Sequence, residues 1–328
     1  MSACAGMLAL RYAGVFAPCR PWARSQNRVA CCSQVYSKCD MLRVLHYQKH
    51  HRAKVYGRWW AAPAVVLLVV CGVSVWVLRS PAPSGPAQLI PLYTADASQW
   101  TAACSKASNP GHKSLVVANV QQGPGTAVSP AWKTSIDRCN QYGRARVLGY
   151  VWTNYGRGGT ASIPEIEAQV RAWYALYPGH IGGIFFDGAS DTVPGTHISN
   201  QPFYHTLTGY VHIREGLGQQ VALNFGVNPS SAWMFDTRTE QAANVIVVFE
   251  GLYAAGPDRL VAWKPARWEQ RYPPYYFAAL VHGAYGSAAA PQPASACHTL
   301  MNDHVGYVYV GTQYNSLPPY LPALMHDC

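Results

Sequence analysis

Residues 181–187 read IGGIFFD, and residues 245–250 read VIVVFE. Both are short, almost continuous apolar runs that end in a carboxylate, and residues 115–120 (LVVANV) form another apolar run. Strands with one solvent face alternate between apolar and polar residues, whereas unbroken apolar runs are typical of strands buried on both faces of a parallel sheet. These stretches therefore predict a parallel sheet that is covered by helices.

Eight such runs follow one another along the chain. They are Leu89–Tyr93, Ser114–Val120, Arg146–Thr153, Ile181–Asp187, Gln220–Phe225, Asn244–Glu250, Phe277–His282 and Gly306–Val310. The ends of successive runs lie 25–38 residues apart, which is the size of a βα unit. Helical spacing of apolar residues predicts helices between runs at Ile163–Tyr177, Phe203–Gly216 and Pro257–Arg271.

Eight βα units in residues 89–328 predict an α/β fold, a single-domain (β/α)8 barrel of the TIM type. An open, doubly wound sheet is the alternative. That sheet would carry a glycine-rich phosphate loop after its first strand, but residues 92–96 contain no glycine. The barrel is therefore the favoured prediction.

Upstream of the barrel, residues 59–78 (WWAAPAVVLLVVCGVSVWVL) carry no charged side chain. Such a run is long enough to cross a bilayer core of about 30 Å as a helix. Basic residues are concentrated before it, so we expect a cytoplasmic tail over residues 1–58 and a barrel outside the membrane. The alternatives are a buried core helix and a signal peptide cleaved near residues 85–87, which would make the protein secreted. Residues 79–88 form a Pro/Ser/Gly linker.

Net charge argues against a nucleic-acid partner. The whole chain of 328 residues carries +10. Residues 1–58 hold ten Lys/Arg and one acid, which gives +9, and residues 59–328 hold fifteen Lys/Arg and fourteen acids, which gives +1. A nucleic-acid-binding domain needs a basic face of its own, and the barrel has no excess of charge for one. We also find no oligomerisation signal and expect a monomer.

Nine of the ten cysteines fall into two groups, and the tenth, Cys71, lies in the apolar run 59–78. Five lie in residues 1–40, which precede a second methionine, Met41, and are interpreted as an over-extended start; a metal-binding cluster there is disfavoured, because no paired C-x-x-C occurs. The other four, in the predicted barrel, suggest two disulfides in an exported chain and allow three pairings. We favour Cys104–Cys139 and Cys297–Cys328, because each closes a local loop.

Polar side chains gather at the ends of the predicted strands, where barrels of this kind carry their chemistry. Asp187 and Glu250 are the candidate catalytic residues, because glycoside hydrolysis uses a pair of carboxylates. The candidate substrate-binding residues are Tyr93, Asn119, Tyr150, Thr153, Tyr155, Asp191, Asn224, His282 and Tyr309. The sequence has no H-E-x-x-H, no G-x-S-x-G and no metal-ligand spacing, so we expect no metal and no cofactor.

Several ordered stretches resemble one known family. They are LIPLY (89–93), GPG (123–125), GYVWTNYG (149–156), GGIFFD (182–187), NFG (224–226), VVFEG (247–251) and VGYVYVGTQYNSLPPYL (305–321). Together they resemble the spherulin-4 proteins (spherulation-specific family 4), which include glycoside hydrolase family 135. The resemblance covers nearly all of residues 89–321 and none of residues 1–88.

The resemblance implies a (β/α)8 barrel that cleaves galactosamine-containing exopolysaccharide internally, with Asp187 and Glu250 as catalytic residues. This chain departs from the family at Gly188, where hydrolytic members commonly carry glutamate; Asp191 could substitute for it. Smaller departures are Asn119-Val120 and Asn224-Phe225, where Asn-Pro is common. The alternatives are a non-catalytic saccharide-binding protein on the same barrel and a structural cell-surface protein of a dormancy programme.

Overall fold

The computed structural model describes most of the predicted barrel. It covers residues 85–106, 109, 111–159, 161–216, 218–235, 241–253, 259–284, 291–321 and 324. The predicted tail, the apolar segment 59–78 and Cys328 lie outside the described residues, as does the linker up to residue 84. Within the described residues, no helix has the length and apolar character needed to cross a membrane.

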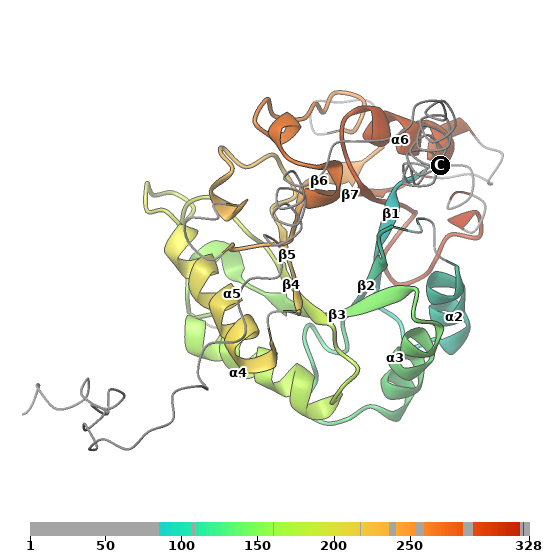
Figure 1. Ribbon diagram of the computed structural model, residues 1–328, viewed down its shortest axis with the longest axis vertical. Helices are drawn as coiled ribbons and strands as arrows, with labels where there is room; N and C mark the ends of the chain where they lie inside the picture. The colour runs from blue at the N-terminus through green and yellow to red at the C-terminus, as the bar shows by residue number, and fades with distance from the viewer. Residues whose placement is uncertain are drawn as a thin grey trace, which may run out of the picture. The chain divides into compact units, whose positions relative to one another are not determined.

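Eight parallel strands form a closed barrel, which confirms the predicted fold class (Figure 1). The strands are β1 (Ala87–Leu92), β2 (Ser114–Ala118), β3 (Ala145–Trp152), β4 (Gly183–Asp187), β5 (Gln220–Asn224), β6 (Val245–Leu252), β7 (Phe277–His282) and β8 (Tyr307–Val310). Each pairs with the next along the chain, and β1 pairs with β8 through Ala87 and Tyr307. This last pairing excludes an open sheet.

Helices follow the strands on the outside of the barrel (Figure 1). They are α2 (Ala97–Ser105), α3 (Pro130–Tyr142), α4 (Ile163–Leu176), α5 (Gln201–Glu215) and α6 (Pro291–Asn302). The predictions for α4 and α5 are confirmed to within two residues. The predicted and observed bounds of the strands also agree to within two residues. The reason is that a buried strand ends close to the point where its apolar run ends.

The helix predicted at Pro257–Arg271 is wrong over its described part. Residues 259–271 form turns and one short 3-10 helix, η3 (Glu269–Arg271). Arg259 is held in a parallel bridge to Leu252 at the end of β6, in extended backbone. Pro265 then has no N–H to donate and its ring clashes with the preceding helical turn, so a helix cannot pass through it.

One predicted disulfide is confirmed. Cys104 on α2 and Cys139 on α3 are bonded, with their Cα atoms 5.1 Å apart, so the first two helices of the barrel are tied covalently. Cys297 on α6 is also disulfide-bonded. Its predicted pairing with Cys328 stays a prediction, because Cys328 lies outside the described residues.

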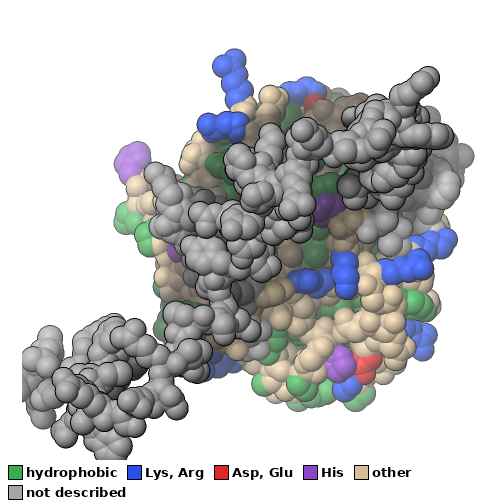
Figure 2. All heavy atoms as spheres, in the orientation of Figure 1, with side chains coloured by type: hydrophobic (Ala, Val, Ile, Leu, Met, Phe, Trp, Pro, Cys, Tyr) green, Lys and Arg blue, Asp and Glu red, His purple; other side chains and the backbone are tan. Residues whose placement is uncertain are grey.

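Lysine and aspartate side chains form ion pairs on the described surface. Lys133 contacts Asp137 at 2.6 Å, and Lys264 contacts Asp303 at 3.1 Å. On the face shown in Figure 2, Lys and Arg side chains lie at several separate points, with hydrophobic side chains visible between them. The expected absence of a nucleic-acid partner stays a prediction.

A glycine sets the distance between β3 and α4. Trp173 of α4 is fully buried, and its indole Nε1 donates a hydrogen bond to the carbonyl oxygen of Tyr150 at 2.8 Å. A Cβ atom at Gly149 would lie 2.6 Å from two ring atoms of Trp173. The helix can therefore approach the strand closely only because position 149 has no side chain.

Replacing this glycine tests the close approach. Gly149→Ala is expected to lower the free energy of unfolding by about 1–3 kcal/mol, because the added methyl group must displace the buried indole. Urea unfolding followed by tryptophan fluorescence measures the change. Gly218→Ala is the matched control, since a Cβ atom there would meet nothing within 4 Å. Equal stability of the two variants would contradict the packing described.

Candidate active site

Two carboxylates and one amide meet at the C-terminal end of the barrel. Asp187 ends β4, Asn224 ends β5, and Glu250 lies near the end of β6. The Asn224 Nδ2 atom donates to Asp187 Oδ1 at 2.7 Å and to Glu250 Oε2 at 2.6 Å. By the triangle inequality, these two carboxylate oxygens are at most 5.3 Å apart, the sum of 2.7 Å and 2.6 Å. We call Asp187 and Glu250 the acidic pair.

A β-bulge turns Glu250 into the barrel. Val247 pairs with Asn224 and shares its inward face. Simple alternation would then place Phe249 inward and Glu250 outward, toward the helices. The register with β7 shifts between Val247 and Phe249, so Val248 is an extra residue in the strand. The extra residue reverses the alternation, and Glu250 faces inward beside Asn224.

Two tyrosines complete the hydrogen bonding of the acidic pair, and a third packs against both of them. Tyr150 Oη donates to Asp187 Oδ2 at 2.7 Å, and Tyr314 Oη donates to Glu250 Oε1 at 2.8 Å. Tyr93 lies edge-on to both rings, with centroid distances of 5.8 Å to Tyr150 and 5.9 Å to Tyr314. All four oxygens of the pair therefore accept a hydrogen bond from the protein.

These phenols stay protonated at neutral pH. Burial and then the charge of Asp187 raise the pKa of Tyr93 and of Tyr150 well above the ordinary value of a tyrosine. Burial and then the charge of Glu250 raise the pKa of Tyr314 in the same way. A neutral phenol can donate a hydrogen bond to each carboxylate, whereas a phenolate would repel it.

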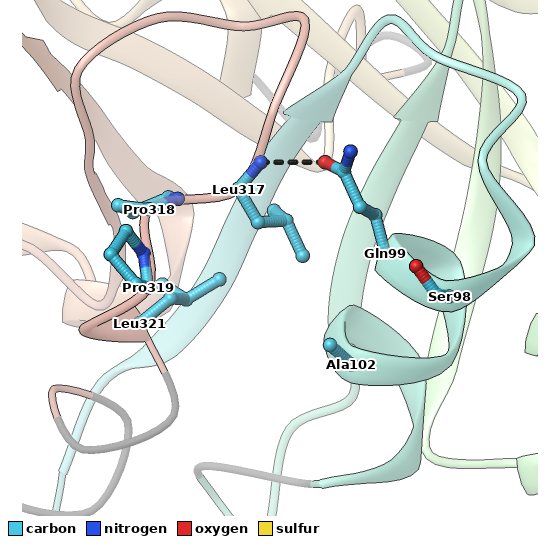
Figure 3. A pocket seen from close by; sticks show the side chains of 7 residues that line it. All are labelled: Ser98, Gln99, Ala102, Leu317, Pro318, Pro319 and Leu321. Carbon is cyan, nitrogen blue, oxygen red and sulfur yellow. Dashed lines mark hydrogen bonds between the residues drawn. The ribbon is translucent and has the colours of Figure 1, made fainter.

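The chain after β8 brings Tyr314 to the acidic pair, and several bonds hold it there. Tyr314 O accepts from Tyr93 N at 2.8 Å, and Leu317 N donates to Gln99 Oε1 at 2.7 Å. Figure 3 shows Gln99 on α2 reaching across to Leu317 at the rim of a cavity of about 210 Å³. The segment is therefore anchored to the first βα unit, on the other side of the barrel closure.

Two predicted substrate-binding residues, Thr153 and Tyr309, are fully buried and bond to the protein backbone, and a role in substrate binding stays a prediction for both. Thr153 makes hydrogen bonds to the carbonyl oxygens of Asp187 and Gly188, at 2.8 Å and 2.9 Å. Tyr309 Oη donates to Gln313 O at 2.7 Å, just before Tyr314. Both residues act as supports: Thr153 fixes the backbone beside one carboxylate, and Tyr309 fixes the segment that reaches the other.

Two further predicted residues, Asn119 and Asp191, make hydrogen bonds that hold loops together. Asn119 Oδ1 accepts from Gly123 N at 3.0 Å and shapes the turn after β2. Asp191 accepts from Trp233 Nε1 at 2.8 Å and from Ser230 N at 2.5 Å, so both of its oxygens join the loops after β4 and β5. Neither residue is hydrogen-bonded to the acidic pair, and a role in substrate binding stays a prediction for both.

The remaining predicted residues lie close to the pair. His282 ends β7 and lies edge-on to Tyr314 at a centroid distance of 6.0 Å. Tyr155 is 38% exposed and lies edge-on to Trp152 at 5.2 Å. The sequence prediction did not include Tyr314, which bonds to Glu250. Tyr314 stands within residues 305–321, a stretch that resembles the family, and this is the signal that could have identified it.

Metal-ligating side chains do not converge in the described ranges. There, no three His, Cys, Asp or Glu residues are grouped closely enough to hold a metal ion. The acidic pair is bonded instead to amide and phenol donors, which are suited to holding carboxylates in place.

The fold and this site define a parallel (β/α)8-barrel protein with two closely spaced carboxylates at the C-terminal ends of its strands. The family model "Spherulation-specific family 4" matches residues 88–327. The chain therefore belongs to spherulation-specific family 4, as the ordered stretches indicated. No curated protein sequence matches it.

One solved structure shares the fold, and two others match it more weakly. Sph3 from Aspergillus clavatus, crystallised in complex with GalNAc, matches with a TM-score of 0.57 and 19% identity over 74% of this chain and 97% of that chain. A glycosyl hydrolase family 2 member from Bacteroides cellulosilyticus gives a TM-score of 0.38 and 12% identity over 60% and 23% of the two chains. An FMN-binding beta-glucuronidase from Facaelibacterium prausnitzii gives a TM-score of 0.40 and 10% identity, over 71% of this chain and 38% of that chain.

An amide-to-carboxylate change tests the position of Asn224. In Asn224→Asp, the new carboxyl would be buried between two carboxylates, so its pKa would rise on folding. A carboxyl whose pKa is raised in the folded state lowers stability as pH rises above its unfolded pKa of about 3.9. We expect a loss of about 1.4 kcal/mol for each unit by which the pKa is raised.

The measurement is the free energy of unfolding of wild type and variant between pH 4 and pH 8. Asn244→Asp is the matched control, because Asn244 Oδ1 only accepts a bond from Val221 N at 2.7 Å, which a carboxylate can also accept. If Asn224→Asp follows the pH dependence of the wild type, Asn224 does not lie between two charges.

Proposed function

We propose that this protein is a glycoside hydrolase that cleaves its substrate with retention of anomeric configuration. The observation that carries the proposal is the spacing of the acidic pair, whose bridged oxygens are at most 5.3 Å apart. Retaining enzymes place their carboxyl groups about 5–5.5 Å apart, whereas inverting enzymes need about 6.5–9.5 Å to admit a water molecule. The spacing supports a covalent glycosyl-enzyme intermediate.

The hydrogen bonds favour one division of roles. Asn224 Nδ2 can only donate, so a proton on Glu250 belongs on Oε1, beside Tyr314. The Tyr314 hydroxyl can donate to the ionised acid and accept from the protonated one. Glu250 is therefore proposed as the general acid and base. Asp187, held by Tyr150 and Asn224, is proposed as the nucleophile that attacks the anomeric carbon.

The proposed substrate is an exopolysaccharide that contains galactosamine or N-acetylgalactosamine, cleaved internally by a monomer. Membership of spherulation-specific family 4 supports this class, and Sph3, which shares the fold, was crystallised with GalNAc. The phenols around the acidic pair also suit a sugar, because they offer both aromatic edges and hydroxyl groups to a pyranose ring.

A digestion tests the chemistry. The purified protein is incubated with partially deacetylated galactosamine polysaccharide, and soluble products are read by mass spectrometry and their anomeric configuration by NMR. We expect oligosaccharides of retained configuration, and at least a 10²-fold loss of activity in Asp187→Asn and Glu250→Gln. Asp303→Asn is the matched control, since Asp303 pairs with Lys264 on the surface. Products of inverted configuration would contradict the proposed roles.

A second candidate function is saccharide binding without turnover. Gly188 supports it, because hydrolytic relatives commonly carry a glutamate there and this chain has one carboxylate fewer. Such a protein would bind the polysaccharide equally well before and after Glu250→Gln and would release no products from either form. Wild-type turnover that Glu250→Gln abolishes would exclude this candidate.

We further propose that the barrel is exported and is either held at the membrane by residues 59–78 or secreted after cleavage. The run of uncharged residues and the basic tail before it support this topology. In cells that express the full chain with a tag at each end, external protease is expected to remove the C-terminal tag and leave the N-terminal one. A C-terminal tag that is protected in intact cells and absent from the medium would contradict export.

A further inference from the structure

We propose that Trp152 is a substrate-contacting residue that forms one wall of the sugar subsite beside Asp187 and donates its indole N–H to an oxygen atom of the sugar. The proposal rests on the proposed function in one respect, the presence of a saccharide at the acidic pair. The ligand class is a neutral pyranose with a hydroxyl or acetamido oxygen free to accept a hydrogen bond.

Strand register places Trp152 level with the nucleophile candidate. Trp152 ends β3 and is the register partner of Asp187 at the end of β4. Side chains two residues apart on a strand share a face, so Trp152 shares the face of Tyr150, whose hydroxyl reaches Asp187. The indole therefore lies on the inward side of the sheet, at the end of the barrel where the acidic pair lies.

The indole fills the space that a side chain at position 188 would need. A Cβ atom at Gly188 would lie 2.4 Å from Trp152 Cζ3 and 2.7 Å from Trp152 Cη2. Gly188 also has φ +67°, a conformation that disfavours other residues. Where family relatives commonly carry a glutamate, this chain therefore presents the benzene edge of a tryptophan, and the wall beside Asp187 is apolar instead of charged.

The polar edge of the same ring has no hydrogen-bond partner among the described residues. Among the described tryptophans, the indole N–H groups of five donate to protein oxygens: Trp100, Trp173, Trp233, Trp263 and Trp268. Trp152 Nε1 makes no such bond to any described residue, and it is not among the buried polar atoms that lack one. A half-buried indole with a solvent-accessible N–H beside a carboxylate pair is suited to receive a sugar oxygen.

The backbone next to Trp152 is held in an unusual shape that keeps this wall in place. Tyr155 has φ +56°, in the left-handed region. Its N–H donates to Gly188 O at 2.8 Å, and its carbonyl oxygen accepts from Asn200 Nδ2 at 2.8 Å. A strained non-glycine residue that is locked by hydrogen bonds on both sides is typical of functional sites. These two hydrogen bonds hold Tyr155 so that its ring is exposed to solvent and lies edge-on to Trp152.

The test uses the indole N–H as its own reporter. The full chain is labelled with ¹⁵N at the tryptophan indoles and titrated with GalNAc, and Trp152→Phe identifies the Trp152 resonance by its loss. We expect that resonance to shift with GalNAc. We also expect Trp152→Phe, which keeps a ring and removes the N–H, to weaken GalNAc binding about five- to tenfold, the effect of one hydrogen bond.

Trp132→Phe is the matched control. Trp132 lies on α3, is 7% exposed and packs edge-on against Trp100, so its replacement should leave GalNAc binding unchanged. The proposal is overturned if the Trp152 resonance does not shift at any GalNAc concentration, or if Trp152→Phe binds GalNAc as tightly as the wild type.

Neither readout requires turnover, so this inference and the proposed function can fail separately. A shifted Trp152 resonance in a protein that releases no products would support the subsite and contradict hydrolysis. Polysaccharide cleavage with an unchanged KM in Trp152→Phe and no shift would support hydrolysis and overturn the subsite.

Discussion

Two carboxylates held within about 5 Å of each other repel, and the rest of the site is arranged around that repulsion. The amide of Asn224 lies between Asp187 and Glu250 and donates to one oxygen of each. Neutral phenols donate to the two oxygens that remain. A carboxylate whose oxygens all accept hydrogen bonds is stabilised without a counter-charge. The site therefore needs no lysine or arginine beside the pair, and its charge stays available to a substrate.

This arrangement draws on strands that are distant along the chain. β3 supplies Tyr150, β4 and β6 supply the carboxylates, β5 supplies the amide, and the segment after β8 supplies Tyr314. The parallel pairing of β3 to β6 brings four of these groups together, and closure of the sheet brings the segment after β8 to the same place. The anchoring of that last segment to α2 and to Tyr93 matters for the same reason: it fixes a donor that belongs to no strand.

Much of this could be predicted from the sequence, for physical reasons that also explain the errors. Apolar runs locate buried strands, and a carboxylate at the end of such a run stands out, so Asp187 and Glu250 could be singled out as candidates. Side-chain direction could not be predicted in the same way. Thr153 and Tyr309 are polar and follow or end strands, yet both point into the protein, where backbone carbonyls take their hydroxyl groups. The residues after Pro257 carried apolar residues at helical spacing, and Pro265 outweighs that pattern.

The bulge at Val248 has a consequence for how this barrel can change over time. Removing or adding one residue between Val247 and Phe249 would rotate Glu250 from the inside of the barrel to the helix side, while every apolar position of β6 could still find a buried place. The chemistry of the site is thus set by the length of one strand as well as by the identity of its residues. Insertions and deletions in barrels are tolerated mainly in loops. Here, a one-residue insertion or deletion inside a core strand would remove Glu250 from the site in a single step. Homologues with a shortened β6 would be expected to keep the architecture and lose the paired acids.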